Sequence, residues 1–298
     1  MSEIVINNLT KNYGSGKGIF DVTLSVKKGE VFGFLGPNGA GKTTTIRHLM
    51  GFINADKGSC TIGGLDCRTK SAEIQKTLGY LPGEIAFMDD MKGMDFIRFI
   101  AKMKDVADLT RANELMELLE LNPQGLLKKM SKGMKQKIGL VCVFLSNPKV
   151  LLLDEPSSGL DPLMQNRFIE LILAEKKKGT TIFLSSHIFE EIERTCDRTA
   201  IIRNGKLATI TDMQTLRASK QKTYLITFET DEQATAFAKE GFKLSSVTSN
   251  TVAVSVKGDV MPLINAMNKY KITALDVKTQ TLEELFLNFY GKGENGNA

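Results

Sequence analysis

Nine consecutive residues have the composition and order of a phosphate-binding loop. They follow an apolar strand candidate at residues 30–35 and precede residues 43–50, which contain no Pro or Gly and can form a helix. Glycines let the backbone turn tightly and direct successive N–H groups inward, and the helix after them adds the positive end of its dipole. The nine residues are Gly36, Pro37, Asn38, Gly39, Ala40, Gly41, Lys42, Thr43 and Thr44.

Two side chains at the end of this loop add phosphate and metal chemistry. Lys42 is placed to reach the β- and γ-phosphates of a nucleotide, and the Thr43 hydroxyl can ligate Mg²⁺. A flexible glycine-rich surface loop is the alternative interpretation. Because a strand precedes the loop and a helix follows it, the context favours the phosphate site.

Two carboxylates directly follow a second apolar strand, residues 150–153, and Pro156 then ends the strand. A continuous apolar run is typical of a buried parallel strand, and α/β sheets bind ligands at the carboxyl ends of such strands. Asp154 can hold Mg²⁺ and its water shell, while Glu155 can polarise a water for attack on the γ-phosphate. A solvent-facing strand end is the weaker alternative.

Composition limits the classes of protein that the chain can belong to. The 298 residues include 42% hydrophobic and 24% charged residues, which is ordinary for a globular protein of one or two domains. The longest apolar run near the middle, residues 138–145, is too short to span a membrane, and we expect no secretory signal at the start of the chain. Four scattered cysteines fit buried thiols in a reducing compartment.

The net charge of +5 permits attraction to phosphates or to an anionic membrane surface. Lysines and arginines are spread along the chain, Trp is absent, and no aromatic-rich basic motif is present. We therefore expect no nucleic-acid partner.

The order of the predicted elements indicates an α/β fold. Alternating residues predict two antiparallel strands at 4–9 and 19–26, joined by a turn-rich loop at 11–18. After the phosphate loop we expect strands at 58–62, 78–81, 150–155, 180–184 and 198–203, and helices at 71–76 (capped by its first residue), 93–104, 110–121, 131–146, 162–178 and 188–195. The apolar stripe of the helix at 93–104, rich in Met, fits a docking face or a core face equally well.

The pattern changes near residue 219, where a β-α-β-β-α-β order typical of a ferredoxin-like domain begins. The sequence thus predicts a nucleotide-binding domain at 1–218 with a helical insert at about 84–146. A small α+β domain is expected at 219–290, ending in an amphipathic helix at 281–287. We expect the tail, 291–298, to be disordered.

The motifs and their spacing resemble those of the ATP-binding-cassette (ABC) ATPases over at least residues 3–210. Their Walker A motif matches residues 36–44, Walker B matches 150–154, and the D-loop matches 158–161. Their catalytic glutamate matches Glu155, and the histidine that contacts the γ-phosphate matches His187.

The resemblance implies a P-loop cassette with an antiparallel β subdomain that binds ATP and Mg²⁺. It assigns Lys42, Glu155 and His187 to catalysis, and Thr43 and Asp154 to the metal. Tyr13, an aromatic residue ahead of the phosphate loop, resembles the family's adenine-stacking residue, although a packing role fits its type as well.

Two segments depart from the family pattern. The signature Leu-Ser-Gly-Gly-Gln is Met-Ser-Lys-Gly-Met at residues 130–134; Ser131 and Gly133 are kept, so this helix start can still face the γ-phosphate of another subunit. Lys132 adds a positive charge there, which either lies beside that phosphate or points to solvent. The Q-loop carries Gly83 and then Glu84 where a metal-sensing Gln is expected.

The resemblance also implies partners and a location. A cassette whose signature faces another subunit's nucleotide dimerises on ATP, so we expect a homodimer. One cassette followed by a ferredoxin-like domain resembles the bacterial ABC-2 type exporters, whose permease is a separate multi-span polypeptide at the cell membrane. A soluble ABC ATPase acting on ribosomes or DNA is the alternative function, and a regulatory cassette with decayed catalysis is a third.

Overall fold

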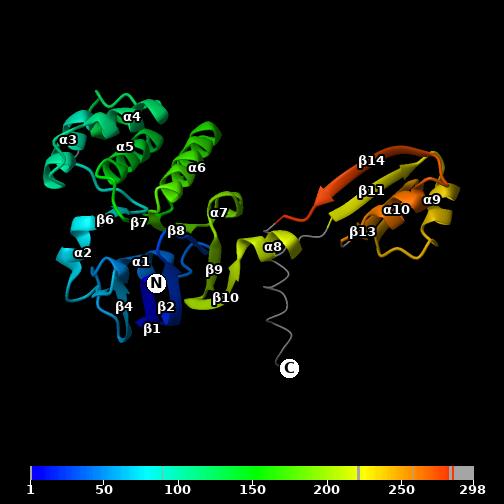
Figure 1. Ribbon diagram of the computed structural model, residues 1–298, viewed down its shortest axis with the longest axis horizontal. Coiled ribbons are helices and arrows are strands. Elements are labelled where there is room, and N and C mark those ends of the chain that lie inside the picture. The colour runs from blue at the N-terminus through cyan, green and yellow to red at the C-terminus, as the bar shows by residue number, and fades with distance from the viewer. Residues whose placement is uncertain (1, 89, 220–221, 257, 282–283, 285–298) are drawn as a thin grey trace. The chain divides into compact units, whose positions relative to one another are not determined.

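The computed structural model describes residues 2–88, 90–219, 222–256, 258–281 and 284. The chain divides into two compact units, the first ending at Met213 and the second beginning at Gln214 (Figure 1). The division falls at the start of helix α8 (Met213–Ser219), a few residues before the domain boundary expected between residues 218 and 219.

A mostly parallel sheet with strand order β10-β9-β3-β8-β7-β6 forms the centre of the first unit. Neighbouring strands from β9 to β6 run parallel, and β10 runs antiparallel to β9. Every residue of β3, β7 and β8 is buried, as expected for strands covered on both faces. The strands are β3 (Val31–Leu35), β6 (Leu78–Leu81), β7 (Val150–Asp154), β8 (Thr181–Ser186), β9 (Arg198–Arg203) and β10 (Lys206–Asp212).

An antiparallel sheet of order β2-β1-β4-β5 forms the other layer of the first unit. Its strands are β1 (Ser2–Gly14), β2 (Lys17–Lys27), β4 (Lys57–Ile62) and β5 (Leu65–Asp66). One cluster of buried side chains draws on both sheets and on α1, with Ile4, Phe34, Ile46 and Leu152 among its members. The predicted antiparallel subdomain is therefore present and shares its core with the parallel sheet.

The prediction of a loop at residues 11–18 is wrong for most of this segment. Pairing continues from Lys11 with Ile19 to Gly14 with Lys17, so that only Ser15 and Gly16, both at positive φ, form the turn. The residues of this hairpin end lack an apolar alternation, so its pairing had no signal in the sequence. Asp56 supports the extended β1 strand by accepting from the Lys11 ammonium and the Asn12 N–H, each at 2.8 Å. Tyr13 consequently lies on a strand.

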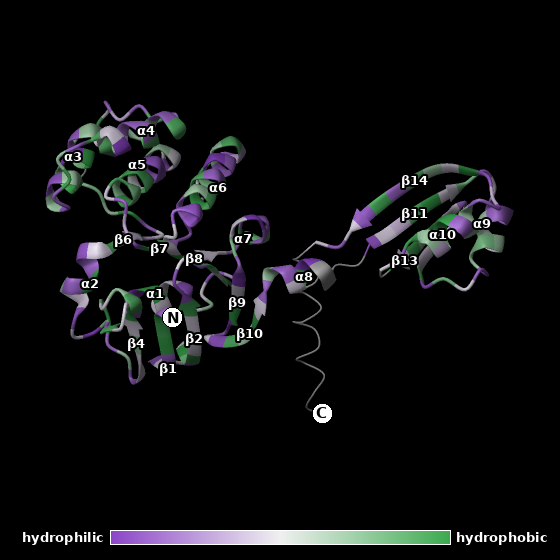
Figure 2. Ribbon diagram, viewed as in Figure 1, coloured by the Kyte–Doolittle hydropathy of each residue, from purple (hydrophilic) through white to green (hydrophobic). Residues whose placement is uncertain are grey.

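Helices cover the parallel sheet and build the insert between β6 and β7 (Figure 1). Figure 2 shows both hydrophobic and hydrophilic residues along α6, which buries Phe168 and Ile172. The first unit's helices are α1 (Lys42–Leu49), α2 (Ser71–Thr77), α3 (Gly93–Met103), α4 (Thr110–Leu118), the 3₁₀ turn η1 (Leu127–Lys129), α5 (Lys132–Phe144), α6 (Pro162–Lys177) and α7 (Phe189–Thr195).

The ends of these helices test the expected caps. Ser131 Oγ accepts a hydrogen bond from the Met134 N–H at 3.2 Å, which confirms the cap of α5. Ser71, by contrast, is the first residue inside α2, and no side chain caps this helix. The turn built on Asp66 ends at Lys70, so the helix begins one residue earlier than a Ser71 cap would require. On α3, Ile97 is buried while 67% of Met103 is exposed, so its apolar stripe is not one buried face.

The second unit follows the predicted β-α-β-β-α-β order and forms an antiparallel sheet of order β12-β13-β11-β14. Phe228 and Phe237 pack at 5.0 Å between ring centroids in its core. Its elements are β11 (Lys222–Phe228), α9 (Asp231–Phe237), β12 (Leu244–Thr248), β13 (Thr251–Val256), α10 (Met261–Met267) and β14 (Ile272–Thr279).

The predicted helix at 281–287 and tail at 291–298 lie outside the described residues, apart from Thr281 and Glu284. These two exchange hydrogen bonds, Thr281 N–H to Glu284 Oε2 at 3.0 Å and Glu284 N–H to Thr281 Oγ1 at 3.1 Å. Such a reciprocal pair is the capping box that opens a helix.

None of the helices in the described part of the chain has the length and apolar character needed to cross a membrane.

Candidate functional site

The phosphate loop connects the buried strand β3 to α1, as the sequence predicts. Gly39 and Gly41 adopt φ of 78° and 111°, which favour glycine. A Cβ on Gly36 would lie 2.4 Å from the Ile202 carbonyl oxygen, so glycine is required where the loop passes β9. The loop is thus held against the sheet with its backbone in the conformation that a phosphate cradle needs.

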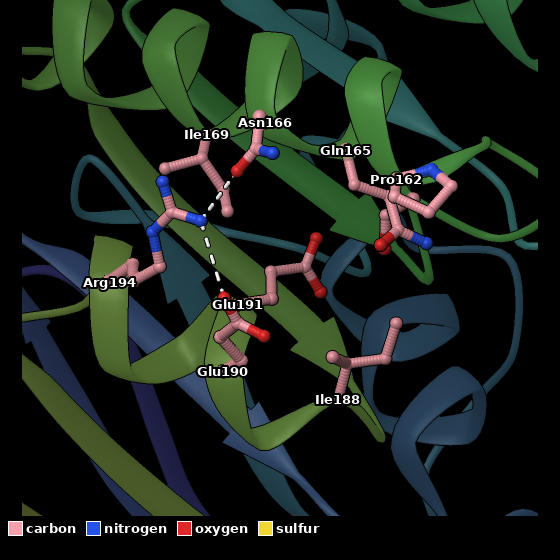
Figure 3. Close-up of a pocket in the computed structure, with 9 residues that line it drawn as sticks. Pro162, Gln165, Asn166, Ile169, Ile188, Glu190, Glu191 and Arg194 are labelled. Atoms are coloured by element: carbon pink, nitrogen blue, oxygen red, sulfur yellow. Dashed lines mark hydrogen bonds and ion pairs between the residues drawn. The ribbon is translucent and has the colours of Figure 1, made fainter.

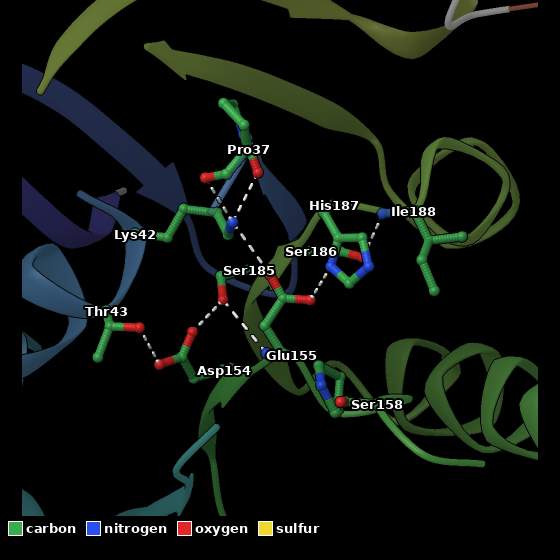
Figure 4. A network of polar contacts seen from close by, with 12 residues as sticks. Pro37, Lys42, Thr43, Asp154, Glu155, Ser158, Ser185, Ser186, His187 and Ile188 are labelled. Carbon is green, nitrogen blue, oxygen red and sulfur yellow. Dashed lines mark hydrogen bonds and ion pairs between the residues drawn. The ribbon is translucent and has the colours of Figure 1, made fainter. Parts of the chain in front are cut away.

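Lys42 lies inside this loop, and only 6% of its side chain is exposed. Its Nζ donates to the carbonyl oxygens of Gly36 at 2.6 Å and Pro37 at 3.2 Å (Figure 4). It also forms an ion pair with Glu155 Oε1 at 3.0 Å. A cation so desolvated needs such partners, and a phosphate entering the loop is a natural replacement for the carboxylate.

Asp154 ends β7 and is completely buried. The Thr43 hydroxyl donates to Asp154 Oδ2 at 2.7 Å, and Ser185 at the end of β8 donates to the other carboxylate oxygen. The structure therefore brings together Thr43 and Asp154, the two oxygen donors predicted to hold Mg²⁺, which prefers such hard ligands. Ser185 is a further site residue whose only signal in the sequence is its position at a strand end.

Glu155 follows Asp154 with φ of 49°, a left-handed conformation that is uncommon for a non-glycine residue. Its N–H donates to the Ser185 carbonyl oxygen at 3.1 Å, which fixes this turn at the end of the strand. Its Oε2 lies 2.5 Å from His187 Nδ1, so that Lys42, Glu155 and His187 form one continuous polar chain (Figure 4). All three predicted catalytic residues are in contact.

A cleft of about 520 Å³ opens over the phosphate loop and Glu155. Tyr13 is at its rim with 54% of its surface exposed, and Lys11 Nζ lies 5.9 Å from the ring centroid. Sequence reasoning missed five of the lining residues, for which the turns at 15–16 and 204–205 are the only signals: Gly16, Lys17, Gly18, Asn204 and Gly205.

The signature residues Ser131 and Gly133 are not among the described residues that line this cleft. They begin α5, which packs on the segment after Glu155 in the same chain. Lys132 Nζ donates to Ser158 Oγ at 2.9 Å, which neither sequence interpretation of Lys132 includes. Gln136, also missed by sequence reasoning, is buried one turn later and donates to the Pro156 carbonyl oxygen at 2.7 Å.

The Q-loop departure lies beside the carboxylate that is predicted to bind metal. A Cβ on Gly83 would lie 3.4 Å from Asp154 Oδ2. A longer side chain at this position would therefore reach Asp154, and glycine provides no such side chain. Glu84 is exposed.

A smaller pocket of about 100 Å³ lies between α6 and α7 (Figure 3). Glu191 lines it with 4% of its surface exposed, and neither of its carboxylate oxygens has a hydrogen-bond partner among the described residues. Burial raises the pKa of Glu191 to about 7; the nearby hydroxyls of Ser186 and Ser157 act in the opposite direction, and the Glu155 charge raises it further.

A phosphate loop between a parallel strand and a helix, with Asp154 and Glu155 at the end of a neighbouring strand, defines a P-loop nucleotide-binding fold.

Comparisons with known proteins specify the family. Residues 19–158 match the ABC transporter family. The uncharacterized ABC transporter ATP-binding protein YhcH of Bacillus subtilis (strain 168) is 32% identical over 96% of this chain and 95% of its own length. The bacitracin transport ATP-binding protein BcrA of Bacillus licheniformis is 31% identical over 99% and 100% of the two chains.

Comparison with solved structures identifies the same fold. An ATP-binding subunit of an ABC transporter is 30% identical, with a TM-score of 0.67 over 72% of this chain and 92% of its own. A dimeric ATP-binding cassette in a post-hydrolysis state with ADP and Pi has the same fold at 19% identity, with a TM-score of 0.64 over 70% of this chain and 98% of its own. The chain belongs to the family of ABC transporter ATP-binding proteins, which confirms the resemblance.

The buried carboxyl of Glu191 predicts a pH dependence of stability. Its folded-state pKa is raised from 4.5 to about 7, so the stability it contributes is present below about pH 4.5 and is lost as pH rises through 7. Between pH 5 and pH 8, we expect the free energy of unfolding of the wild type to fall by about 2 to 3 kcal/mol relative to Glu191→Gln, which cannot ionise.

Urea unfolding at both pH values measures this difference. Glu190→Gln is the matched control, because it removes a neighbouring carboxyl with 75% of its side chain exposed. Parallel pH profiles for the wild type and Glu191→Gln would show that Glu191 is ionised at neutral pH in the folded protein.

Proposed function

We propose that this chain is the Mg²⁺-dependent ATP-hydrolysing subunit of an exporter. It would dimerise on ATP and power transport through a separate membrane permease, at the cytoplasmic face of the cell membrane. The observation that carries the proposal is the polar chain of Lys42, Glu155 and His187 beside the buried pair of Thr43 and Asp154. Intact catalytic side chains in contact argue against a decayed regulatory cassette.

The geometry supports a two-stage use of these residues. The β- and γ-phosphates would enter the loop and take the Lys42 ammonium from Glu155, as anions bind at such loops. Glu155, still positioned by its backbone turn and by His187, then has a free carboxylate oxygen to orient the attacking water. The adenine would stack on Tyr13 at the rim of the cleft.

The residues present fit Mg²⁺. Thr43 and Asp154 offer a hydroxyl and a carboxylate oxygen that already lie 2.7 Å apart, and the buried Asp154 has no cationic partner among the described ion pairs. When bound there, Mg²⁺ would neutralise charge on the phosphates. Ser185 would keep the carboxylate in place through its other oxygen.

The position of the signature supports a dimer. Ser131 and Gly133 lie outside the cleft of their own chain, so their N–H groups would bind ATP only in a second copy. The solved cassette with ADP and Pi is itself dimeric. We infer that two copies close head to tail on two ATP molecules.

An apolar groove of about 240 Å³ supports the permease assignment. It lies between the helical insert and the parallel sheet, and Tyr80, Pro82, Ile85, Phe96 and Ile100 line it. The part of the chain that the structure describes contains no helix able to span a membrane. Two relatives are named for bacitracin transport and linearmycin resistance, the second 31% identical over 96% of this chain. These names favour export as the direction of transport.

Replacing the catalytic carboxylate should trap the dimer. Glu155→Gln keeps the shape of the side chain but cannot act as a base, so ATP should hold the two copies together. We expect size-exclusion chromatography with ATP and Mg²⁺ to move this variant from monomer to dimer, and the same variant with ADP to stay monomeric. A variant that is monomeric with ATP would contradict ATP-driven dimerisation.

Gentle solubilisation of membranes from cells that express the tagged chain tests the transport assignment. We expect a multi-span permease to co-purify. Ile100→Asp, which places a charge in the groove, should reduce that recovery without loss of ATP binding. Ile210→Asp, at a partly exposed apolar position on β10 outside the groove, is the control. Recovery of ribosomes alone would contradict transport and favour the soluble ABC function.

A further inference from the structure

The start of α5 contacts the segment after Glu155 at three positions, 132, 133 and 136. Lys132 Nζ donates to Ser158 Oγ at 2.9 Å, and Gln136 Nε2 donates to the Pro156 carbonyl oxygen at 2.7 Å. Between them, a Cβ on Gly133 would lie 2.7 Å from the Gly159 carbonyl oxygen, so the two backbones approach as closely as glycine allows. The signature and the D-loop of one chain therefore form a continuous contact.

Glycine on the D-loop side makes room for the lysine. Gly159 has φ of 81°, which favours glycine, and a Cβ there would lie 3.0 Å from Lys132 Cγ and 3.1 Å from Cδ. The methylene chain of Lys132 thus lies along the Gly159 backbone, and its ammonium reaches Ser158. Lys132 is accommodated by specific neighbours, although its side chain is exposed.

A lysine is an unusual choice at this position of the helix. Lys132 is the first residue of α5, where the positive end of the helix dipole opposes a cation, and the first turn contains no acidic residue to offset it. The hydrogen bond to Ser158 is its polar contact in the structure. This cost indicates that the contact serves more than the stability of α5.

We propose that Lys132 is a positioning residue that joins the signature to the D-loop of the same chain, so that both move together when two cassettes close. The inference depends on the proposed ATPase function. Ser158 also donates its N–H to the Glu155 carbonyl oxygen at 3.1 Å. A displacement of the signature is therefore transmitted through Lys132 and Ser158 to the backbone of Glu155.

The two sequence interpretations of Lys132 make different predictions. If its ammonium bound the γ-phosphate of the partner's ATP, its removal would raise KM for ATP with or without Ser158. If it pointed to solvent, its removal would change nothing. A joining role requires that kcat falls, that KM changes little, and that the effect depends on Ser158.

The experiment is a double-mutant cycle on steady-state ATP hydrolysis by the purified full chain. Lys132→Met keeps the methylene packing against Gly159 and removes the ammonium, and Ser158→Ala removes the acceptor. We expect each variant to lower kcat by about 3- to 10-fold with KM within about 2-fold, and the double variant to be no slower than either single one. Lys132→Arg keeps a donor and should restore most of kcat.

Thermal melting checks that each variant folds. If Lys132→Met does not fold, Ser158→Ala and Lys132→Arg still test the joining role. Ser158→Ala should lower kcat, whereas Lys132→Arg should not. Multiplicative losses in the double variant, a rise in KM, or unchanged kinetics would each overturn the inference. A wild-type chain that hydrolyses no ATP would instead overturn the proposed function.

Discussion

The buried ammonium of Lys42 is the interaction on which the nucleotide site depends. An unpaired cation in this position would cost several kcal/mol, so the loop supplies two carbonyl oxygens and Glu155, directly after β7, supplies a carboxylate. These contacts hold the loop and the Glu155 carboxylate together. Because Glu155 contacts both Lys42 and His187, the contacts that satisfy the buried charge would also position this carboxylate for its proposed role as the base.

The parallel sheet determines which side chains can meet in this way. Parallel pairing of β7 with β8 places Asp154 opposite Ser185, and the carboxyl end of β3 delivers the phosphate loop to the same edge. Residues more than a hundred positions apart, Thr43 and Asp154, are then within hydrogen-bond distance. The left-handed turn at Glu155 adds a local constraint, since it redirects the chain from the strand to the D-loop and α6.

Much of this arrangement could be predicted from the sequence, because glycine spacing, apolar runs and carboxylates at a strand end have direct physical meaning. The end of the β1–β2 hairpin at residues 11–18 could not, since polar residues and glycines without an alternating pattern make up most of its pairs. Ser185 and Gln136 act through contacts to distant segments, and a serine or glutamine alone carries no signal of its partner. The burial of Glu191 could not be predicted either, because it depends on the packing of α7 near α6. The hydrogen bond from Lys132 to Ser158 could be found only in the structure, because the two residues are 26 positions apart.

ATP hydrolysis by the purified chain, with and without Mg²⁺, tests the central claim most directly when Lys42→Ala is compared with the wild type. The account predicts Mg²⁺-dependent phosphate release by the wild type. In Lys42→Ala the rate of release should fall by at least about 100-fold, because the phosphates lose the Lys42 ammonium. Lys70→Ala, an exposed lysine outside the cleft, should match the wild type. Equal turnover by Lys42→Ala and the wild type would contradict the assignment of the site.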